Sequence, residues 1–206
     1  MPKAIILRLE SYLTYLAQLK REGKTNATSE ELAALFGISS SRVRQDLLAL
    51  GVSGRPRAGY DIDNLRSTIV EELDLCNIKP LAIVGLGNLG RALARSDIWT
   101  DGGFDLRAAF DSDPALIGTE VRSGLKVRNT TELFGVIKSE SIVAACITVP
   151  AASAQPVTDL LVTAGVTGIW NFSPIEINVP EQVAVENQRL EQGLMTLSYK
   201  MSTISN

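Results

Sequence analysis

The feature that most constrains this 206-residue chain is the spacing of three glycines in IVGLGNLGRALARS, residues 83–96. Gly85, Gly87 and Gly90 directly follow a short apolar run and open a segment with helical periodicity. In a dinucleotide-binding turn of this pattern, the first glycine permits the tight turn, the second lets a pyrophosphate approach the backbone, and the third lets helix and strand pack closely. The chain nevertheless contains no histidine, the usual acid or base of enzymes that use such cofactors. The glycine turn therefore raises the question of what a nucleotide bound here is for.

Short apolar runs alternate with helical segments from residue 81 onward. The predicted buried strands are residues 81–85, 106–111, 141–150 and 168–174, and the predicted helices between them are residues 88–96 and 152–165. This alternation is typical of an α/β fold with a doubly wound parallel sheet of the Rossmann type. Ligands of such sheets bind beyond the carboxyl ends of the strands, which is where the glycine turn falls.

Asp111 ends the second predicted strand, 26 positions after Gly85. This is close to the spacing at which a carboxylate accepts hydrogen bonds from the adenosine ribose hydroxyls. Because a carboxylate repels a 2′-phosphate, we expect NAD(H) and not NADP(H). Asp113 competes for this role, although its Asp-Pro step also suits a residue that caps the next turn.

Two further loops fall at strand ends, TVP at 148–150 and NFSP at 171–174. A strand-terminating turn is the alternative for both loops, and core packing is the alternative for Phe172. The predicted cofactor-binding residues are Gly85, Gly87, Asn88, Leu89, Gly90, Asp111, Asp113, Thr148, Val149, Pro150, Asn171, Phe172 and Ser173.

The first 60 residues are basic, with nine Lys/Arg against five Asp/Glu, whereas the remainder has eleven against eighteen. Such a split suggests an anionic partner for the N-terminal segment. After a first amphipathic helix that ends at Gly23, Thr28 and Glu31 form a capping box for a short helix that ends at Gly37. Ser39 is the predicted N-cap of the next helix, so the two short helices make a helix-turn-helix.

The outer face of the second of these helices carries hydroxyl, arginine and glutamine side chains, which can contact phosphates and base edges in a major groove. The following segment, GVSGRPRAGY (51–60), resembles a two-stranded wing whose arginines contact a DNA backbone or a minor groove. The alternative is a helical pair with a solvated basic face. The predicted DNA-binding residues are Ser39, Ser40, Ser41, Arg42, Arg44, Gln45, Arg55 and Arg57.

The remaining segments suggest how the chain is divided. Residues 62–76 are predicted to form a linker helix with Cys76 on its apolar face, and NIKP (77–80) marks a boundary. Cys76 and Cys146 are both interpreted as small buried hydrophobes, and no metal site is predicted. The C-terminal segment is predicted to be a helix with a narrow apolar seam, which packs on its own sheet or on a second subunit. The seam residues are Leu190, Leu194, Leu197, Met201 and Ile204.

The predicted domains are a winged helix with its linker helix (1–76), a nucleotide-binding domain (77–186) and a dimerisation helix (187–206). No apolar stretch reaches the roughly 20 residues of a membrane span, and no signal peptide is evident. We therefore expect a cytoplasmic protein with no membrane partner.

Taken together, these motifs resemble the Rex family of redox-sensing transcriptional repressors over nearly the whole chain. The segments that carry the resemblance are TSEELAALFG, VRQDLLALG, GVSGRPRAGY, VGLGNLGRAL, FDSDP, TVPAASAQ, GIWNFSPIEINVP and VAVEN. The resemblance implies a homodimer with a C-terminal helix exchanged between subunits. It also implies that the dimer binds operator DNA when NADH is scarce and releases it when NADH binds. The nucleotide would then be a signal, and the protein would not be an enzyme.

The chain departs from the family pattern at several positions. Gln45 stands where the family usually has a lysine, and the wing arginines are shifted to Arg55 and Arg57. Arg8 matches an arginine whose aspartate partner is replaced by Gln188 and Arg189, and Ser96 replaces a tyrosine near the nicotinamide. An arginine facing Arg8 is expected to repel it, so we predict weakened discrimination between NADH and NAD⁺.

Two alternative functions remain open at this point. The same fold could take a CoA-type ligand, since TVP and NFSP also resemble the CoA-binding domains of acyl-CoA ligases, although Asp111 favours a dinucleotide. The chain could also be a small NAD-dependent dehydrogenase, but no Tyr-x-x-x-Lys pair stands at the strand ends to supply a base.

Overall fold

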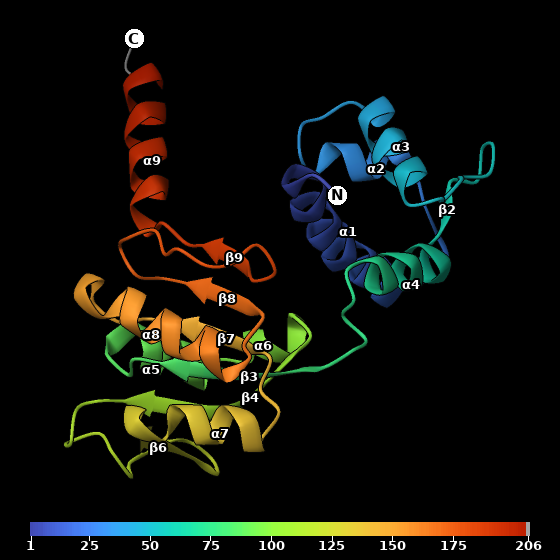
Figure 1. Cartoon of the computed structure of the whole chain (residues 1–206). Coiled ribbons are helices and arrows are strands. Elements are labelled where there is room, and N and C mark those ends of the chain that lie inside the picture. Colours follow the sequence, from blue (N-terminus) through green and yellow to red (C-terminus); the bar gives the residue numbers. More distant parts are fainter. Residues whose placement is uncertain (205–206) are drawn as a thin grey trace. The chain divides into compact units, whose positions relative to one another are not determined.

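The computed structural model describes residues 1–204, which form two compact units, the first Met1–Asn77 and the second beginning at Ile78 (Figure 1). Among these residues, no helix combines the length and the apolar character that a membrane crossing requires.

The first unit consists of four helices and a small antiparallel sheet, counted over its described residues. The helices are α1 (Lys3–Arg21), α2 (Ser29–Ala34), α3 (Ser40–Ala49) and α4 (Ile62–Glu72), and β1 (Asn26–Ala27) pairs with β2 (Tyr60–Asp61). The amphipathic stripe of α1 faces the core as its spacing predicts, because Leu9, Tyr12, Leu16 and Leu19 are all buried. This core positions α3 at the surface of the unit.

The segment predicted as a linker helix is the fourth helix of this core. Ile62, Leu65 and Ile69 of α4 are buried in the same cluster as the residues of α1. The helix ends at Glu72, before Cys76, and Cys76 is exposed. The prediction that Cys76 is a buried hydrophobe is therefore wrong, whereas Cys146 is buried as expected.

The wing is smaller than the two-stranded ribbon that the sequence suggested. A single antiparallel bridge joins Arg55 to Gly59, and the turn between them places Arg57 at φ 63°. The strand that follows, β2, pairs with β1 and not with the segment before the turn. Gly59 is required here, since its φ is +77° and a Cβ would lie 2.3 Å from the carbonyl oxygen of Ala27. The wing is therefore a tight loop whose base, at Gly59, packs against the backbone of Ala27 and Thr28 just before α2.

The second unit contains a sheet of seven strands in the order β5-β6-β4-β3-β7-β8-β9, counted over the residues that the structure covers. The strands are β3 (Lys79–Val84), β4 (Phe104–Asp111), β5 (Glu120–Arg122), β6 (Leu125–Asn129), β7 (Ala144–Ile147), β8 (Gly168–Asn171) and β9 (Ala184–Asn187). All pairings are parallel except that of the edge strand β5. The predicted doubly wound parallel sheet is confirmed, with β5, β6 and β9 added by segments that the sequence pattern had left unassigned.

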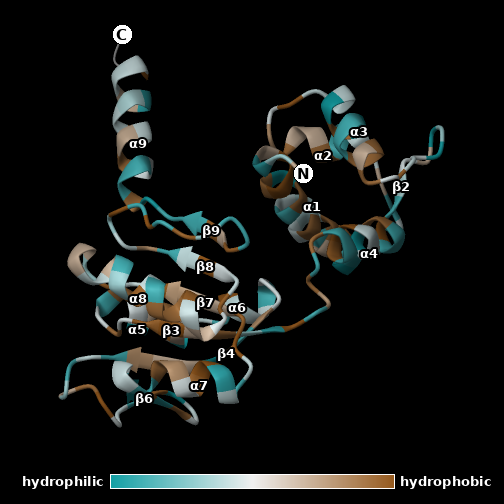
Figure 2. Cartoon of the chain, in the orientation of Figure 1, coloured by the Kyte–Doolittle hydropathy of each residue, from teal (hydrophilic) through white to brown (hydrophobic). Residues whose placement is uncertain are grey.

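Helices cover both faces of this sheet. One face packs against α7 (Leu133–Ser139) and α8 (Ala151–Ala164), and the other against α5 (Asn88–Arg95) and α6 (Ile98–Asp101). A short 3₁₀ helix, η1 (Thr130–Glu132), precedes α7. Successive residues of β3 alternate between the two clusters, so that Ala82 and Val84 lie on one side and Leu81 and Ile83 on the other. Burial on both faces explains why β3 and β7 read as continuous apolar runs, which Figure 2 shows in brown.

The C-terminal helix α9 (Leu190–Ile204) has no buried residue. Its apolar seam is exposed along its whole length, from Leu190 at 66% to Ile204 at 84%. Of the two alternatives left open for this seam, packing on the chain's own sheet does not occur. Residues 205 and 206 of the predicted dimerisation segment lie outside the described residues.

Candidate nucleic-acid interface and nucleotide cleft

The two short helices begin where their capping residues predict. The Thr28 hydroxyl accepts a hydrogen bond from the Glu31 N–H at 3.1 Å, and the Thr28 N–H donates to the Glu31 carboxylate at 2.8 Å. The Ser39 hydroxyl accepts from the Arg42 N–H at 3.2 Å. Ser39 is therefore the cap of α3, and the first turn of this helix presents Ser40 and Ser41.

A buried ion pair fixes α3 against α1. The Arg8 guanidinium donates to both Asp46 oxygens, from Nε at 2.6 Å and from Nη2 at 2.8 Å. Asp46 is 2% exposed, and the Tyr12 hydroxyl lies 3.5 Å from it. The bond to Asp46 raises the pKa of Arg8, while burial and the Asp46 charge raise the pKa of Tyr12 to about 12. Sequence reasoning missed this pair, because a carboxylate in a surface-type helix gives no signal of burial.

Arg8 and Arg189 each have acceptors within their own unit, and the predicted repulsion between them stays a prediction. Arg8 pairs with Asp46, as above. Arg189 donates to the Pro174 carbonyl at 2.7 Å and lies 3.9 Å from the Glu176 carboxylate. Both arginines therefore have partners within the described residues of their own unit.

Both exposed arginines of α3 lie beside carboxylates. Arg42 Nε is 3.5 Å from Asp46 Oδ1. Arg44 Nη1 is 3.5 Å from Glu30 Oε1 and donates to the hydroxyls of Ser29 at 3.1 Å and Ser40 at 3.3 Å. Gln45 is also exposed.

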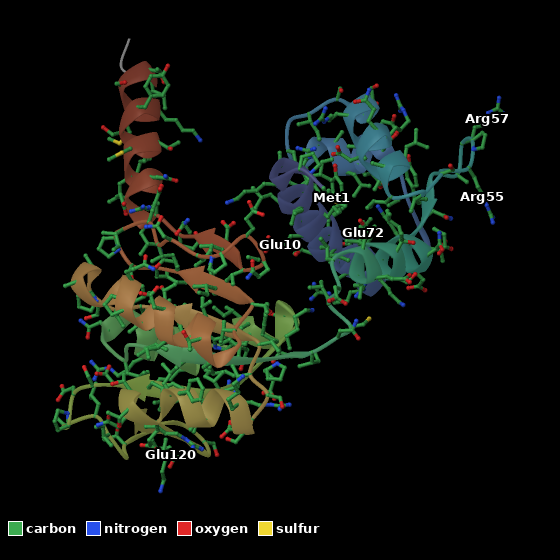
Figure 3. The ribbon with its side chains drawn as sticks, viewed as in Figure 1. Met1, Glu10, Arg55, Arg57, Glu72 and Glu120 are labelled. Atoms are coloured by element: carbon green, nitrogen blue, oxygen red, sulfur yellow. The ribbon has the colours of Figure 1, made fainter. Side chains whose placement is uncertain are left out.

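The wing carries the other two predicted arginines, and Figure 3 shows Arg57 at the tip of the loop with Arg55 lower on the same loop. Both side chains are exposed. A groove of about 360 Å³ brings them together with α3, and its lining includes Arg44, Arg55, Arg57, Gly54 and Tyr60. Arginines from a helix and from a wing thus border one concave surface, which suits a DNA backbone.

The three glycines of the turn have different surroundings. Gly85 has φ +96°, which favours glycine, and a Cβ there would lie 2.9 Å from Thr148. A Cβ on Gly90 would lie 1.9 Å from the Gly85 carbonyl oxygen, so Gly90 is required for packing. Gly87 is the N-cap of α5, its φ is not strained, and a Cβ there would meet no atom of the described residues within 4 Å. The described residues therefore do not require a glycine at this position, which in a dinucleotide-binding turn is the one that lets a pyrophosphate approach the backbone.

Asp111 holds the glycine turn as well as bordering it. One carboxylate oxygen accepts from the Leu86 N–H at 2.5 Å, and the other accepts from the Asp113 N–H at 2.9 Å. Asp113 in turn caps the next turn by accepting from the Ala115 N–H at 2.9 Å. Thr148 donates its hydroxyl to the Gly85 carbonyl at 2.6 Å, which ties the second loop to the glycine turn.

The third loop is held by buried polar residues. Asn171 is 1% exposed and donates to the Ile175 carbonyl and to the Asn187 side chain, while it accepts from the Ser173 N–H. Ser173 is 2% exposed and donates to the Val149 carbonyl at 2.8 Å. Phe172 packs edge-on against Trp170 with centroids 4.5 Å apart. Asn171 and Ser173 therefore fix the conformation of the loops, and Phe172 lines the space between these loops.

A cleft of about 890 Å³ lies at the carboxyl ends of the strands. Of the predicted residues, it is lined by Gly85, Gly87, Asp111, Asp113, Thr148, Val149, Pro150 and Phe172. Asn88, Leu89, Gly90, Asn171 and Ser173 are not among the residues that line the cleft. Thr130 and Thr131 also line the cleft and were missed, because they follow β6, a strand that the sequence pattern did not reveal.

The fold and these surfaces define a class: a transcriptional regulator in which a helix-turn-helix DNA-binding unit precedes a Rossmann-type nucleotide-binding unit. A family model described as a putative DNA-binding protein N-terminus matches residues 1–47, and one described as a CoA binding domain matches residues 77–175. The chain belongs to the Rex family of redox-sensing transcriptional repressors. It is 38% identical to the redox-sensing transcriptional repressor Rex of Clostridium botulinum, over 96% of this chain and 94% of that one.

Solved structures agree with this assignment. A crystal structure of RSP, a Rex-family repressor, in complex with NAD⁺ and operator DNA is similar with a TM-score of 0.92 and 33% identity, over 100% of this chain and 94% of that one. The structure of RSP with NADH is similar with a TM-score of 0.89 and 33% identity, over 100% and 96%. Membership in a repressor family agrees with the prediction that the chain is a regulator and not an enzyme.

Proposed function

We propose that this chain represses transcription by binding operator DNA through α3 and the wing, and that NADH bound in the cleft of the second unit releases the DNA. The observation that carries the proposal is that one chain holds both an arginine-bearing helix-turn-helix and a glycine turn whose Gly87 faces open space. RSP, which resembles the whole chain, has been crystallised with NAD⁺ and operator DNA and with NADH. Differential affinity of NADH for the DNA-released state is sufficient for such a switch.

The cleft residues fit a dinucleotide. The first N–H groups of α5 and the bare backbone at Gly87 suit a pyrophosphate. Asp111 has lone pairs beyond the two N–H groups that it accepts from, so it can also take a ribose hydroxyl. Its charge disfavours the 2′-phosphate of NADP(H) and the 3′-phosphate of CoA. We therefore propose NAD(H) as the ligand, with Thr148, Asn171 and Ser173 positioning the loops around it.

The DNA surface consists of α3 and the wing. We propose that α3, whose N-cap is Ser39, enters the major groove. The side chains that α3 would bring to the DNA are Ser40, Ser41, Arg42, Arg44 and Gln45. Arg55 and Arg57 contact the backbone or the minor groove from the wing.

The active form is a homodimer, because helix-turn-helix proteins read two-fold symmetric operators as dimers. Two apolar surfaces support this proposal: the exposed seam of α9, and a groove of about 590 Å³ whose lining includes Trp99, Phe104 and Trp170. If the α9 helix of each subunit packed its apolar seam into the apolar groove of the other subunit, both surfaces would be covered. We also infer a cytoplasmic location, where operator DNA and NAD(H) are present together.

We propose that this chain discriminates less strongly between NADH and NAD⁺ than a protein with the family's usual residues. Arg8 is held by Asp46 within its own unit, and the Ser96 hydroxyl donates to the Leu93 carbonyl at 3.0 Å. The proposed weakening rests on Gln188 and Arg189, which replace the family's aspartate partner of Arg8, and on Ser96, which replaces its tyrosine.

Titrating NADH, NAD⁺ and CoA into the full-length protein by calorimetry tests the ligand. Titrating NADH into the complex with a duplex enriched from a random pool tests the switch. We expect NADH to bind and to lower DNA affinity. Binding of NADH with no change in DNA affinity would refute the sensing function.

A further inference from the structure

The groove between α3 and the wing contains a carboxylate that the DNA-binding function leaves unexplained. Glu30, the second residue of α2, borders this groove together with Arg44, Arg55 and Arg57. A negative charge on a surface that faces phosphates opposes binding to any duplex, whatever its sequence.

Glu30 interacts with Arg44 both directly and through the Ser29 hydroxyl. The Glu30 carboxylate lies 3.5 Å from Arg44 Nη1 and accepts from the Ser29 hydroxyl at 3.2 Å. Ser29 is itself 7% exposed and accepts from the same Arg44 nitrogen at 3.1 Å. The pKa of Glu30 lies below its ordinary value, because the carboxylate accepts from its own backbone N–H and from the hydroxyls of Ser29 and Ser40. The group is thus charged at neutral pH and faces one guanidinium.

The wing arginines differ from Arg44 in this respect. Over the described residues, no carboxylate lies within ion-pair distance of Arg55 or Arg57. Without an ion pair to fix them, these exposed guanidinium groups can contact phosphates in more than one position. Arg44 is held at one nitrogen by hydroxyls on two helices, which leaves the remaining N–H groups of its planar fork in a restricted set of directions.

We propose that Glu30 is a specificity-determining residue: with Ser29 it holds Arg44 in one orientation, so that general affinity for DNA falls while discrimination between base sequences rises. A guanidinium held in this way forms a bidentate pair with a guanine in one register only. The inference rests on the proposed DNA-binding function and adds to it a role for a residue that does not itself touch a base.

The test uses the full-length protein and two DNA duplexes. One is selected from a pool of random sequences by its binding to the wild-type protein, and the other is a scrambled duplex of the same base composition. The affinity of the protein for each duplex is measured at one salt concentration. Glu30→Gln should raise the affinity for the scrambled duplex severalfold and lower the ratio of the two affinities by about tenfold, the discrimination of one bidentate contact. Ser29→Ala, which removes a hydroxyl and no charge, should lower the ratio and leave the scrambled duplex unchanged. Glu72→Gln, at the last residue of α4, is the charge-matched control and should change neither quantity.

A second background separates positioning from bulk charge. In an Arg44→Ala protein, Glu30→Gln should still raise the affinity for the scrambled duplex but should no longer change the ratio. If Glu30→Gln multiplies both affinities of the otherwise wild-type protein by the same factor, or if Ser29→Ala leaves the ratio intact, the inference is wrong while DNA binding stands. Failure of the wild-type protein to enrich any sequence would overturn the proposed function and this inference with it.

Discussion

Replacing Gly87 by valine separates a glycine that the ligand needs from glycines that the fold needs. A Cβ at position 87 would meet no atom of the described residues within 4 Å, and the backbone there, at φ −64° and ψ −166°, suits any residue. The expected change in stability without ligand is that of an unfavourable N-cap residue, at most about 1 to 2 kcal/mol. The valine methyl groups instead fill the space that we assign to the pyrophosphate, so NADH binding should be lost.

Thermal unfolding with and without NADH measures both effects in one experiment. At a ligand concentration of 100 times Kd, a bound ligand stabilises the native state by about 2.7 kcal/mol. For a unit of this size, that corresponds to a rise in Tm of roughly 10 °C. We expect this rise for the wild-type protein and no rise for Gly87→Val. The variant should still bind an operator duplex, which NADH should no longer release.

Gly90→Ala is the matched contrast, because its Cβ would overlap the Gly85 carbonyl oxygen at 1.9 Å. This variant should unfold at lower temperature even without ligand. A Gly87→Val protein that NADH stabilises as much as the wild type would refute the placement of the pyrophosphate at this turn.

Three further predictions concern the Arg8–Asp46 ion pair, the Asp111 carboxylate and the two cysteines. Asp46→Asn leaves the mostly buried Arg8 without its carboxylate and should lower the free energy of unfolding of the first unit by about 3 kcal/mol, as measured by urea denaturation; a change below 1 kcal/mol would mean that the pair behaves as a surface pair. Asp111→Asn keeps an acceptor for the Leu86 N–H but removes the negative charge that repels the 2′-phosphate of NADPH. One repelled charge pair near a surface contributes about 1 to 4 kcal/mol, so the ratio of the NADH and NADPH affinities, measured by calorimetry, should fall by about tenfold. An unchanged ratio would show that Asp111 is not the source of the preference for NADH. Burial raises the pKa of the Cys146 thiol, so in the native protein an alkylating reagent at pH 8 should modify the exposed Cys76 alone, and modification of Cys146 at the same rate would contradict its burial.

Several features could be predicted because their signals are local in the sequence. Thr28 and Glu31 form their capping box within four residues, and Ser39 starts α3 where a hydroxyl before an apolar stripe indicates. Gly85 and Gly90 have the roles that their spacing predicts, since a turn between a strand and a helix imposes the same contacts wherever it occurs.

Other features could not be read from neighbouring residues. The strands β5, β6 and β9 are short or partly exposed, so their patterns do not stand out, and the cleft residues that follow β6 were missed with them. The wing looked like a ribbon because glycines and arginines mark a turn but not the partner of the strand after it.

By itself, then, the order of residues determined the class of each unit, the glycine turn and the basic helix-turn-helix, because capping, periodicity and turn geometry act over a few positions. Only the tertiary structure decided that Asp46 is a buried partner of Arg8, that Asn171 and Ser173 hold loops, and that Glu30 faces Arg44. These pairings join residues on separate helices or loops. Their energy depends on burial and on distances of a few ångströms, which the sequence pattern does not encode.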